Sequence, residues 1–338
     1  MSAQFNLAVV GATGLVGGAL LELINELPLP LGEVSLVASA ESAGKRLQVR
    51  EHYVSVAALE SFDFSTVQLA IFAVPEAVAL QWAPQAADAG VVVVDLSGAF
   101  AADTDVPLVV PEVNLELLED FRNRGIVASP APASMQLAMT LKSLLNMAGL
   151  EQAAAVVLEP AAHYGRAGVD DLARQTARLM NAQEVEPGVF GRQLAFNVLP
   201  TIGEPLGSGA TRAELRVALE TLRLLGEPGL RLSVTIQQVP TFHGCNVALS
   251  CESVQPLALE QWLTALMQQP GLRVQPDHEP ASAVTDAVGD DMVWLSRLRK
   301  DLSREQGFQL SLVTDNLRKG SALNALQIVD LLIKHHLS

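Results

Sequence analysis

Short apolar runs recur along the first third of the chain, separated by helical patterns. The run at residues 7–10 predicts a buried strand, and apolar positions every three or four residues from Leu15 predict a helix. Further runs predict strands at residues 34–38, 69–73, 91–94 and 126–129. A helix is expected at residues 77–89, so strands and helices alternate. The pattern predicts an α/β fold with a doubly wound parallel sheet.

The rest of the chain predicts a different order of elements. Strands are expected at residues 153–158, 231–237 and 247–250, and helices at 169–181, 210–225 and 257–268. These elements predict a second, α+β domain over residues 129–317. Before it, Pro107 and Pro111 predict extended backbone from residue 106 to residue 114.

The first predicted strand ends in a glycine-rich turn of sequence GATGLVG, residues 11–17. A strand, such a turn and a following helix form the phosphate-binding part of a dinucleotide (Rossmann) fold. Gly11 permits the tight turn, Gly14 lets the backbone approach a pyrophosphate, and Gly17 allows close helix–strand contact. The residues expected to bind the cofactor here are Gly11, Thr13, Gly14, Leu15 and Val16. The alternative is a retained fold whose phosphate site stays empty.

The loop after the second predicted strand contributes Ser39, Glu41 and Ser42 to the expected cofactor site. In dinucleotide folds an acidic residue near this point holds the adenosine ribose, and a basic one accepts the additional phosphate of NADP. Glu41 repels a 2′-phosphate, whereas Lys45 partly offsets this repulsion. We therefore expect either NAD or NADP as the cofactor, with NAD bound at least as well; the alternative is an ordinary polar loop.

Composition restricts the classes of partner. With 338 residues, 49% apolar and 17% charged, the chain is long enough for two domains and a large core. A net charge of −15 disfavours nucleic acid and anionic membranes as partners. No apolar run has transmembrane length, and no secretory pattern is found at the N-terminus. Two cysteines and scattered histidines predict neither disulfides nor a metal site, and we expect a cytoplasmic protein.

Six segments, in order, make the chain resemble the aspartate-β-semialdehyde dehydrogenase family nearly from end to end. They are VVGATGLVG (9–17), SAGK (42–45), DVPLVVPEVN (105–114), AFNVLPTIG (195–203), LRKDLS (298–303) and DNLRKGSALNALQI (315–328). The resemblance implies oxidoreductases of amino-acid biosynthesis that reduce an acyl phosphate to a semialdehyde with NADPH. In these enzymes a cysteine thiolate forms a thioester, a histidine moves protons and two arginines hold the substrate.

The resemblance also implies an architecture. A Rossmann domain of residues 1–128 plus 318–338 is expected, with the final helix, 321–332, returning to it. The second domain, residues 129–317, is expected to be of the semialdehyde dehydrogenase C-terminal type and to form a homodimer. Asn316, in the last matching segment, is a further expected cofactor contact.

The family's catalytic residues are missing from the matching positions. Pro130 and Gln136 fix the register of the family segment N-P-N-C-S-T-x-Q, which places Pro132 at the position of the nucleophilic cysteine. Proline has no nucleophile and no N–H that could stabilise an oxyanion. In the segment R-V-P-x-x-x-G-H, Gln238 takes the arginine position and Cys245 takes the histidine position.

Two other positions depart from the family. Ala101 replaces a phosphate-holding arginine, and Pro75-Glu76 replaces a glycine pair beside the nicotinamide. His243 lies two residues before Cys245, on the same face if this segment is a strand. The two side chains are therefore a candidate for a relocated base and nucleophile. The alternative is a polar residue at a strand end beside a buried thiol.

These departures leave two hypotheses for the function. The first is a dimeric pseudoenzyme that binds a small molecule or a protein, with no catalytic residue at the family positions. This resembles the divergent Usg-type branch of the family. The second is an NAD(P)-dependent oxidoreductase that acts on an aldehyde or acyl phosphate with altered residues. The first is favoured, because losing a nucleophile and its base costs several orders of magnitude in rate.

Overall fold

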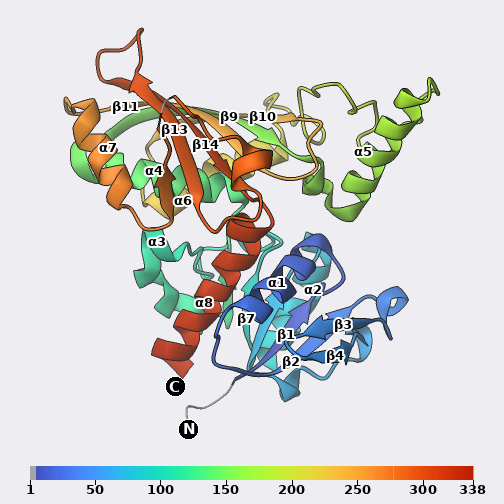
Figure 1. Ribbon diagram of the computed structural model, residues 1–338. Coiled ribbons are helices and arrows are strands. Elements are labelled where there is room, and N and C mark those ends of the chain that lie inside the picture. The colour runs from blue at the N-terminus through green and yellow to red at the C-terminus, as the bar shows by residue number, and fades with distance from the viewer. Residues whose placement is uncertain (1–4, 277, 338) are drawn as a thin grey trace. The chain divides into compact units, whose positions relative to one another are not determined.

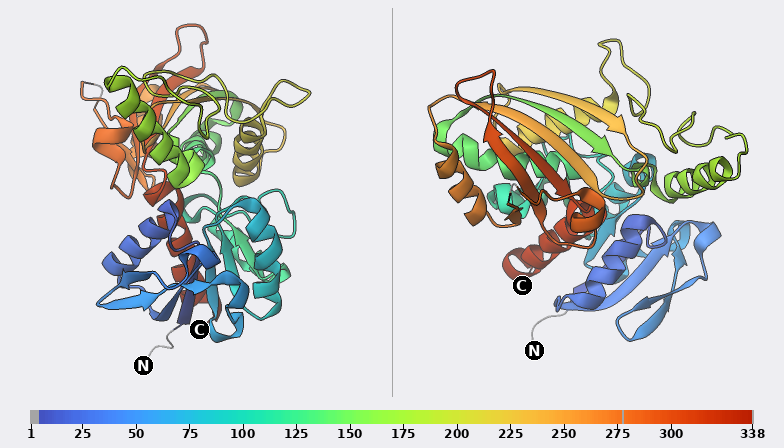
Figure 2. Two further views of the ribbon diagram at one scale, coloured as in Figure 1. Left: turned by 90° about the vertical axis from the view of Figure 1, so that its right-hand side faces the viewer. Right: turned by 45° about the horizontal axis from the view of Figure 1, so that its top comes forward.

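The chain folds into two compact units. The computed structural model describes residues 5–276 and 278–337. Unit 1 comprises Met1–Ala131 with Ser321–Ser338, and unit 2 comprises Pro132–Gly320. Figure 1 colours both units along the chain, and Figure 2 shows them from two further sides.

Unit 1 is built on a six-stranded sheet of order β5-β2-β1-β6-β7-β8, whose neighbouring strands are all parallel. Its strands are β1 (Phe5–Val10), β2 (Leu31–Ala38), β5 (Ala57–Ala58), β6 (Leu69–Phe72), β7 (Val92–Asp95) and β8 (Ile126–Ala128). After β1, the chain adds β2 and β5 on one side of β1, and it later adds β6, β7 and β8 on the other side, as in a doubly wound sheet. The predicted α/β Rossmann fold is confirmed.

The helices of unit 1 bury their apolar sides against this sheet. They include α1 (Leu15–Glu26), α2 (Glu76–Asp88) and α8 (Asn324–Leu332). Leu7 of β1, Leu20 of α1 and Leu326 of α8 are all fully buried members of one core cluster. In Figure 1 the red α8 lies among blue and cyan elements, so the end of the chain completes the core begun by its first residues.

The prediction of extended backbone over residues 106–114 was wrong at its end. Pro111–Asn114 forms a short helix, α3, with Pro111 in the first turn. Proline is tolerated there because the N–H it lacks would have no partner inside the helix. The Asn114 amide holds the turn, since it accepts from the N–H of Val110 (2.9 Å) and donates to the carbonyl of Leu108 (2.8 Å).

Unit 2 contains a mixed six-stranded sheet of order β10-β9-β11-β14-β13-β12. Its strands are β9 (Leu150–Glu159), β10 (Arg231–Gln238), β11 (Cys245–Ser253), β12 (Leu272–Val274), β13 (Val293–Lys300) and β14 (Gly307–Thr314). β9 pairs parallel with β10 and antiparallel with β11. This is the predicted α+β architecture, although β12, β13 and β14 were not predicted from the sequence.

Helices cover one face of this sheet and leave the other face exposed. The covering helices are α4 (Pro132–Ala148), α6 (Arg212–Leu225) and α7 (Leu259–Gln268), and the right-hand view of Figure 2 shows them behind the sheet. Along β9, Ala155 and Val157 are buried while Val156 is exposed, which is the alternation expected for a half-covered sheet. α5 (Gly165–Met180) lies beyond the β10 edge.

Two smaller features complete the description. Unit 1 carries a hairpin of β3 (Arg46–Val49) and β4 (His52–Ser55), which was not predicted. In the part of the chain that the structure describes, no helix combines the length and apolarity needed to cross a membrane.

Candidate functional site

The glycine turn after β1 has the geometry of a phosphate-binding turn. Gly11 has a φ of +93°, and a Cβ there would lie 2.2 Å from the carbonyl oxygen of Ala73. A Cβ on Gly17 would lie 2.3 Å from the carbonyl oxygen of Gly11. Both positions therefore require glycine, and the turn closes with a bond from the Gly14 N–H to the Gly11 carbonyl (2.9 Å).

Within the described residues, no side chain caps the N-terminus of α1. Gly14 is the N-cap and provides no side-chain bond, and the first turn contains no acidic residue. The first N–H groups of a helix have no partner inside the helix. Those at the start of α1, including Leu15 and Val16, can donate to an anion and are favoured by the helix dipole.

The loop after β2 lies beside this turn. Thr13 and Ser42 are joined by a hydroxyl–hydroxyl bond of 3.3 Å, and the Lys45 ammonium also donates to Ser42 (3.3 Å). Glu41 is exposed in the short turn Ala40–Ser42. The structure thus brings Ser42 of this loop next to Thr13 of the glycine turn.

The remaining predicted cofactor contact lies elsewhere in the chain. Asn316 belongs to unit 2, where its buried Oδ1 accepts a bond from the N–H of Gly244 (2.8 Å). In unit 1, α2 begins at Glu76 with Pro75 as its N-cap, so a carboxylate occupies the first turn of that helix. An anion is less favoured beside that carboxylate than at the start of α1.

In unit 2, Pro132 is the first residue of α4. Its ring packs closely on Gly320, where an added Cβ would lie 2.7 Å from the Pro132 Cβ. A helix N-terminus lowers the pKa of a cysteine placed there. The element that would activate a thiolate is therefore present, and the residue in that place is a proline.

Three polar side chains form a row across neighbouring strands at one end of this sheet. Glu159 ends β9, Gln238 ends β10 in register with Glu159, and Cys245 begins β11. All three are buried, and the Gln238 amide donates to the Glu159 carbonyl (2.8 Å). The Cys245 thiol donates to the Glu159 carboxyl, with Sγ 4.0 Å from Oε1.

The electrostatics of this row keep the thiol protonated. Burial raises the pKa of Cys245 well above its ordinary value, Glu159 raises it further, and a contact with Gln136 only partly opposes this. Burial also raises the pKa of Glu159, against the opposing effects of His163 and Arg216. The thiolate is the nucleophilic form of cysteine, so Cys245 lacks the environment of a reactive thiol.

The suggested pairing of His243 with Cys245 on one strand face was wrong. β11 begins only at Cys245, and the residue between them, Gly244, has a φ of +90°. The backbone turns before the strand starts, so the two-residue periodicity of a strand does not apply. The Nδ1 of His243 is buried and has no hydrogen-bond partner among the described residues.

Sequence reasoning missed Glu159. The available signal was an acidic residue directly after the apolar strand pattern at residues 153–158. Gln136, used only to set the register, is fully buried, and neither of its amide atoms has a well-formed hydrogen bond within the described residues. No group of three or more metal-binding side chains is found in residues 5–276 and 278–337.

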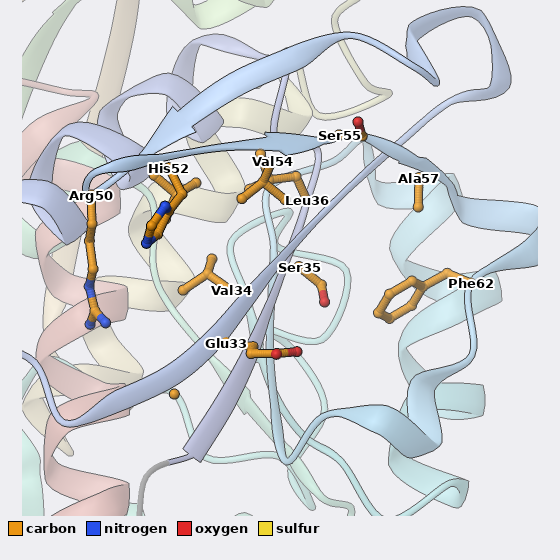
Figure 3. Close-up of a pocket in the computed structure, with 12 residues that line it drawn as sticks. Glu33, Val34, Ser35, Leu36, Arg50, His52, Val54, Ser55, Ala57 and Phe62 are labelled. Atoms are coloured by element: carbon orange, nitrogen blue, oxygen red, sulfur yellow. The ribbon is translucent and has the colours of Figure 1, made fainter.

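Each unit also has a cavity. Of the site residues named above, only Gln238 lines one of them. In unit 1 a cavity of about 430 Å³ lies between β2 and the β3–β4 hairpin. Figure 3 shows Arg50 at one end and Phe62 at the other, with Glu33 and Ser35 of β2 between them. In unit 2 a cavity of about 400 Å³ reaches Gln238. None of the predicted cofactor residues lines either cavity.

Comparison with known proteins identifies both parts of the chain. Residues 6–121 match the NAD-binding domain of semialdehyde dehydrogenases, and residues 141–319 match the dimerisation domain of the same proteins. Aspartate-semialdehyde dehydrogenase 2 of Vibrio cholerae is 39% identical over 99% of this chain and 100% of its own length. A USG-1 protein homologue of Azotobacter vinelandii is 38% identical over 99% of both chains.

A solved structure is similar over the whole fold. The crystal structure of aspartate semialdehyde dehydrogenase II from Vibrio cholerae, complexed with ASA, has a TM-score of 0.97 and 38% sequence identity. The match covers 99% of this chain and 100% of that one.

Proposed function

The chain belongs to the semialdehyde dehydrogenase family, and we propose that it is a non-catalytic, dimeric member that keeps a dinucleotide-binding unit. The observation that carries the proposal is Pro132 at the first position of α4, where the family resemblance expects the nucleophilic cysteine. A proline there removes the atom that would form a covalent bond with the substrate.

No neighbouring side chain replaces the missing thiol. Cys245 is buried and its pKa is raised, so it stays protonated at neutral pH. Ser134, in the first turn of α4, donates its hydroxyl to Glu220 (2.6 Å). Glu220 in turn pairs with Arg216 (2.7 Å), so the carboxylate that accepts from Ser134 is already held by a guanidinium. The described part of unit 2 therefore offers no activated nucleophile near the start of α4.

Substrate recognition is altered as well. Gln238 stands where the resemblance expects an arginine, and its Nε2 is already bonded to the Glu159 carbonyl. A neutral amide cannot replace the two-pronged, charged contact of a guanidinium with a carboxylate. Ala101, at the other arginine position, is buried and has no polar side chain. Both losses weaken binding of an anionic substrate.

Cofactor binding is supported by a different set of residues. Gly11 and Gly17 keep the close backbone contacts of the turn, and no described side chain caps the start of α1. The match of residues 6–121 to an NAD-binding domain agrees with this geometry. With Glu41 beside the turn, NAD should bind at least as tightly as NADP.

Dimerisation is supported by the exposed face of the unit 2 sheet. Exposed positions at its centre carry small or uncharged side chains, namely Ala154, Val156, Ser233, Thr235 and Ala248. An uncharged sheet face suits self-association of a chain with a net charge of −15, because it brings few carboxylates together. The match of residues 141–319 to a dimerisation domain favours a homodimer.

The second hypothesis is an active NAD(P)-dependent oxidoreductase. Relatives named aspartate-semialdehyde dehydrogenase and USG-1 homologue are 39% and 38% identical to this chain, so identity alone does not separate them. A covalent-intermediate assay distinguishes the two hypotheses. The protein is incubated with aspartate semialdehyde and NADP or NAD without phosphate, and its intact mass is measured.

The non-catalytic hypothesis predicts no acyl adduct on this protein, while the Vibrio cholerae relative serves as the positive control. An adduct that forms on the wild-type protein and disappears in Cys245→Ala would support the oxidoreductase instead. An adduct that persists in Cys245→Ala would place a nucleophile elsewhere and would also contradict the proposal.

A further inference from the structure

The segment that follows α5 displays several apolar side chains to solvent. Residues 180–206, here called the arm, connect the end of α5 to the residues before α6. Phe196 is 66% exposed and Val198 is 50% exposed. Other large apolar side chains exposed in the arm are Met180, Val189 and Leu206. Five large, exposed apolar side chains in one segment make it a candidate interaction surface.

A buried side chain fixes the arm just before Phe196. Gln175 of α5 is only 1% exposed. Its Oε1 accepts bonds from the N–H groups of Leu194 (2.7 Å) and Ala195 (3.1 Å), and its Nε2 donates to the Arg192 carbonyl (3.4 Å). Leu194 and Ala195 belong to a buried apolar cluster. Phe196 is therefore held in a defined place, although its ring faces solvent.

The backbone of Phe196 is strained. Its φ is +58°, in the left-handed region that bulky residues rarely adopt. Such conformations persist where the surrounding structure imposes them, and they gather at functional positions. Here the conformation turns a large ring away from the buried residues Leu194 and Ala195. In the isolated chain, no burial of the exposed ring offsets this strain.

We propose that Phe196 is an anchor of the homodimer contact and is buried against a second copy of the chain. The inference rests on the dimer put forward under the proposed function. Leu199 pairs with Gln238 through two backbone bonds (2.9 and 3.0 Å), so the arm runs along the end of the edge strand β10. The arm therefore adjoins the edge strand of the sheet whose exposed, uncharged residues include Val156 and Thr235.

The charge pattern of the arm favours a second copy of the chain as its binding partner. Residues 194–203 (LAFNVLPTIG) carry no charged side chain, in a chain whose net charge is −15. Two acidic copies repel each other, and an uncharged contact reduces that cost. Aromatic residues that become buried at the centre of such contacts carry much of the binding free energy.

The test compares Phe196→Asn with the wild-type chain by sedimentation equilibrium. Asparagine tolerates the left-handed backbone, so the substitution removes the ring without adding strain. The dimer dissociation constant should rise by at least about 30-fold, the effect expected for a hot-spot residue. Tyr53→Asn, which removes an aromatic ring that is 62% exposed in unit 1, is the matched control and should leave the constant unchanged.

Two further measurements keep the outcome clear. Val198→Ser should raise the dissociation constant by a smaller factor. This variant provides the test of the contact if Phe196→Asn loses the circular dichroism spectrum of the native fold. Amide exchange at residues 194–199 should slow when the protein is concentrated from monomer to dimer. A wild-type dimer whose dissociation constant is the same in Phe196→Asn would overturn this inference alone. A wild-type protein that stays monomeric would overturn the dimer itself.

Discussion

At the scale of single residues, we propose that Glu41 decides which dinucleotide the turn accepts. Its carboxylate is exposed in the turn Ala40–Ser42, whose Ser42 bonds to Thr13 of the glycine turn. A carboxylate repels the 2′-phosphate of NADP, whereas the ribose hydroxyl of NAD carries no charge. On this proposal, selectivity depends on the charge of one exposed side chain.

Replacing Glu41 by arginine should reverse this selectivity. We expect Glu41→Arg to tighten NADP binding by at least about tenfold, because a repulsive charge becomes an attractive, bidentate one. Calorimetric titration with NAD and NADP measures both affinities. Glu60→Arg makes the same change of charge at another exposed position of unit 1 and should alter neither. Clear NADP preference in the wild-type chain would contradict the assignment of Glu41.

The two buried thiols predict how stability depends on pH. Burial raises the pKa of both Cys245 and Cys251, so the folded chain retains these protons when the unfolded chain has lost them. The stabilising contribution is complete below about pH 8.5, the usual thiol pKa, and is lost as the pH rises above it. Cys251→Ala should therefore flatten the alkaline decline of the unfolding free energy by about 1.4 kcal/mol per pH unit.

Urea unfolding between pH 7.5 and pH 10 measures this slope. The cavity left by Cys251→Ala lowers stability at every pH, so only the change of slope tests the thiol. Cys245→Ala should flatten the curve in the same direction. Parallel curves for the wild type and both variants would show that the buried thiols do not titrate as described.

At the scale of elements, α1 contains two adjacent glycines with different roles. A Cβ on Gly17 would meet the backbone of Gly11 and Ala12 at 2.3–2.8 Å, whereas a Cβ on Gly18 would meet nothing within 4 Å. Gly17 lets α1 lie close to the turn, and Gly18 only adds flexibility to a helix. The distance between helix and turn therefore depends on Gly17.

Alanine substitutions separate these roles. Gly18→Ala should raise the unfolding free energy by about 0.5–1 kcal/mol, since alanine is the better helix former. Gly17→Ala should lower it by several kcal/mol, because α1 must move away from the turn, and should abolish NAD binding. Thermal unfolding and NAD titration of the two variants provide the comparison. Equal effects of both substitutions would show that the close helix–turn contact is not required.

The strands of unit 1 could be predicted from continuous apolar runs. Apolar runs such as residues 69–73 and 91–94 are hydrophobic throughout, because both faces of a parallel sheet are covered. β13 (VWLSRLRK) was missed because Arg297, Arg299 and Lys300 interrupt its apolar pattern, whereas β9, β10 and β11 of the same sheet were predicted. The β3–β4 hairpin was missed because Arg50, with a φ of +54°, occupies a turn position where glycine is usual.

Part of the candidate site could be predicted from the sequence, and part could not. Residues 11–17 could be predicted because local spacing alone specifies a phosphate turn. The row of Glu159, Gln238 and Cys245 could not, because three strands far apart in the sequence bring it together. Of the two interpretations of His243, the shared strand face was wrong because β11 begins only at Cys245, and the position just before a strand agrees with the alternative.

At the scale of the whole molecule, each unit keeps the family's architecture, and we propose that unit 2 has lost the family's covalent chemistry. The match to Vibrio cholerae aspartate semialdehyde dehydrogenase II has a TM-score of 0.97, so the backbone of the family is retained. Helix α4 still begins at the expected position, but with Pro132. We account for this combination by a role in binding, for which the scaffold is needed and the nucleophile is not.

The most direct test of this account is phosphate-dependent oxidation of aspartate semialdehyde by the purified protein. Formation of NADH or NADPH is followed at high protein concentration, with the Vibrio cholerae relative as the positive control. We predict no turnover above the blank for the wild type or for Pro132→Cys, since the latter still has Gln238 and Cys245 at the arginine and histidine positions. Robust turnover by the wild type that is abolished in Cys245→Ala would contradict the account.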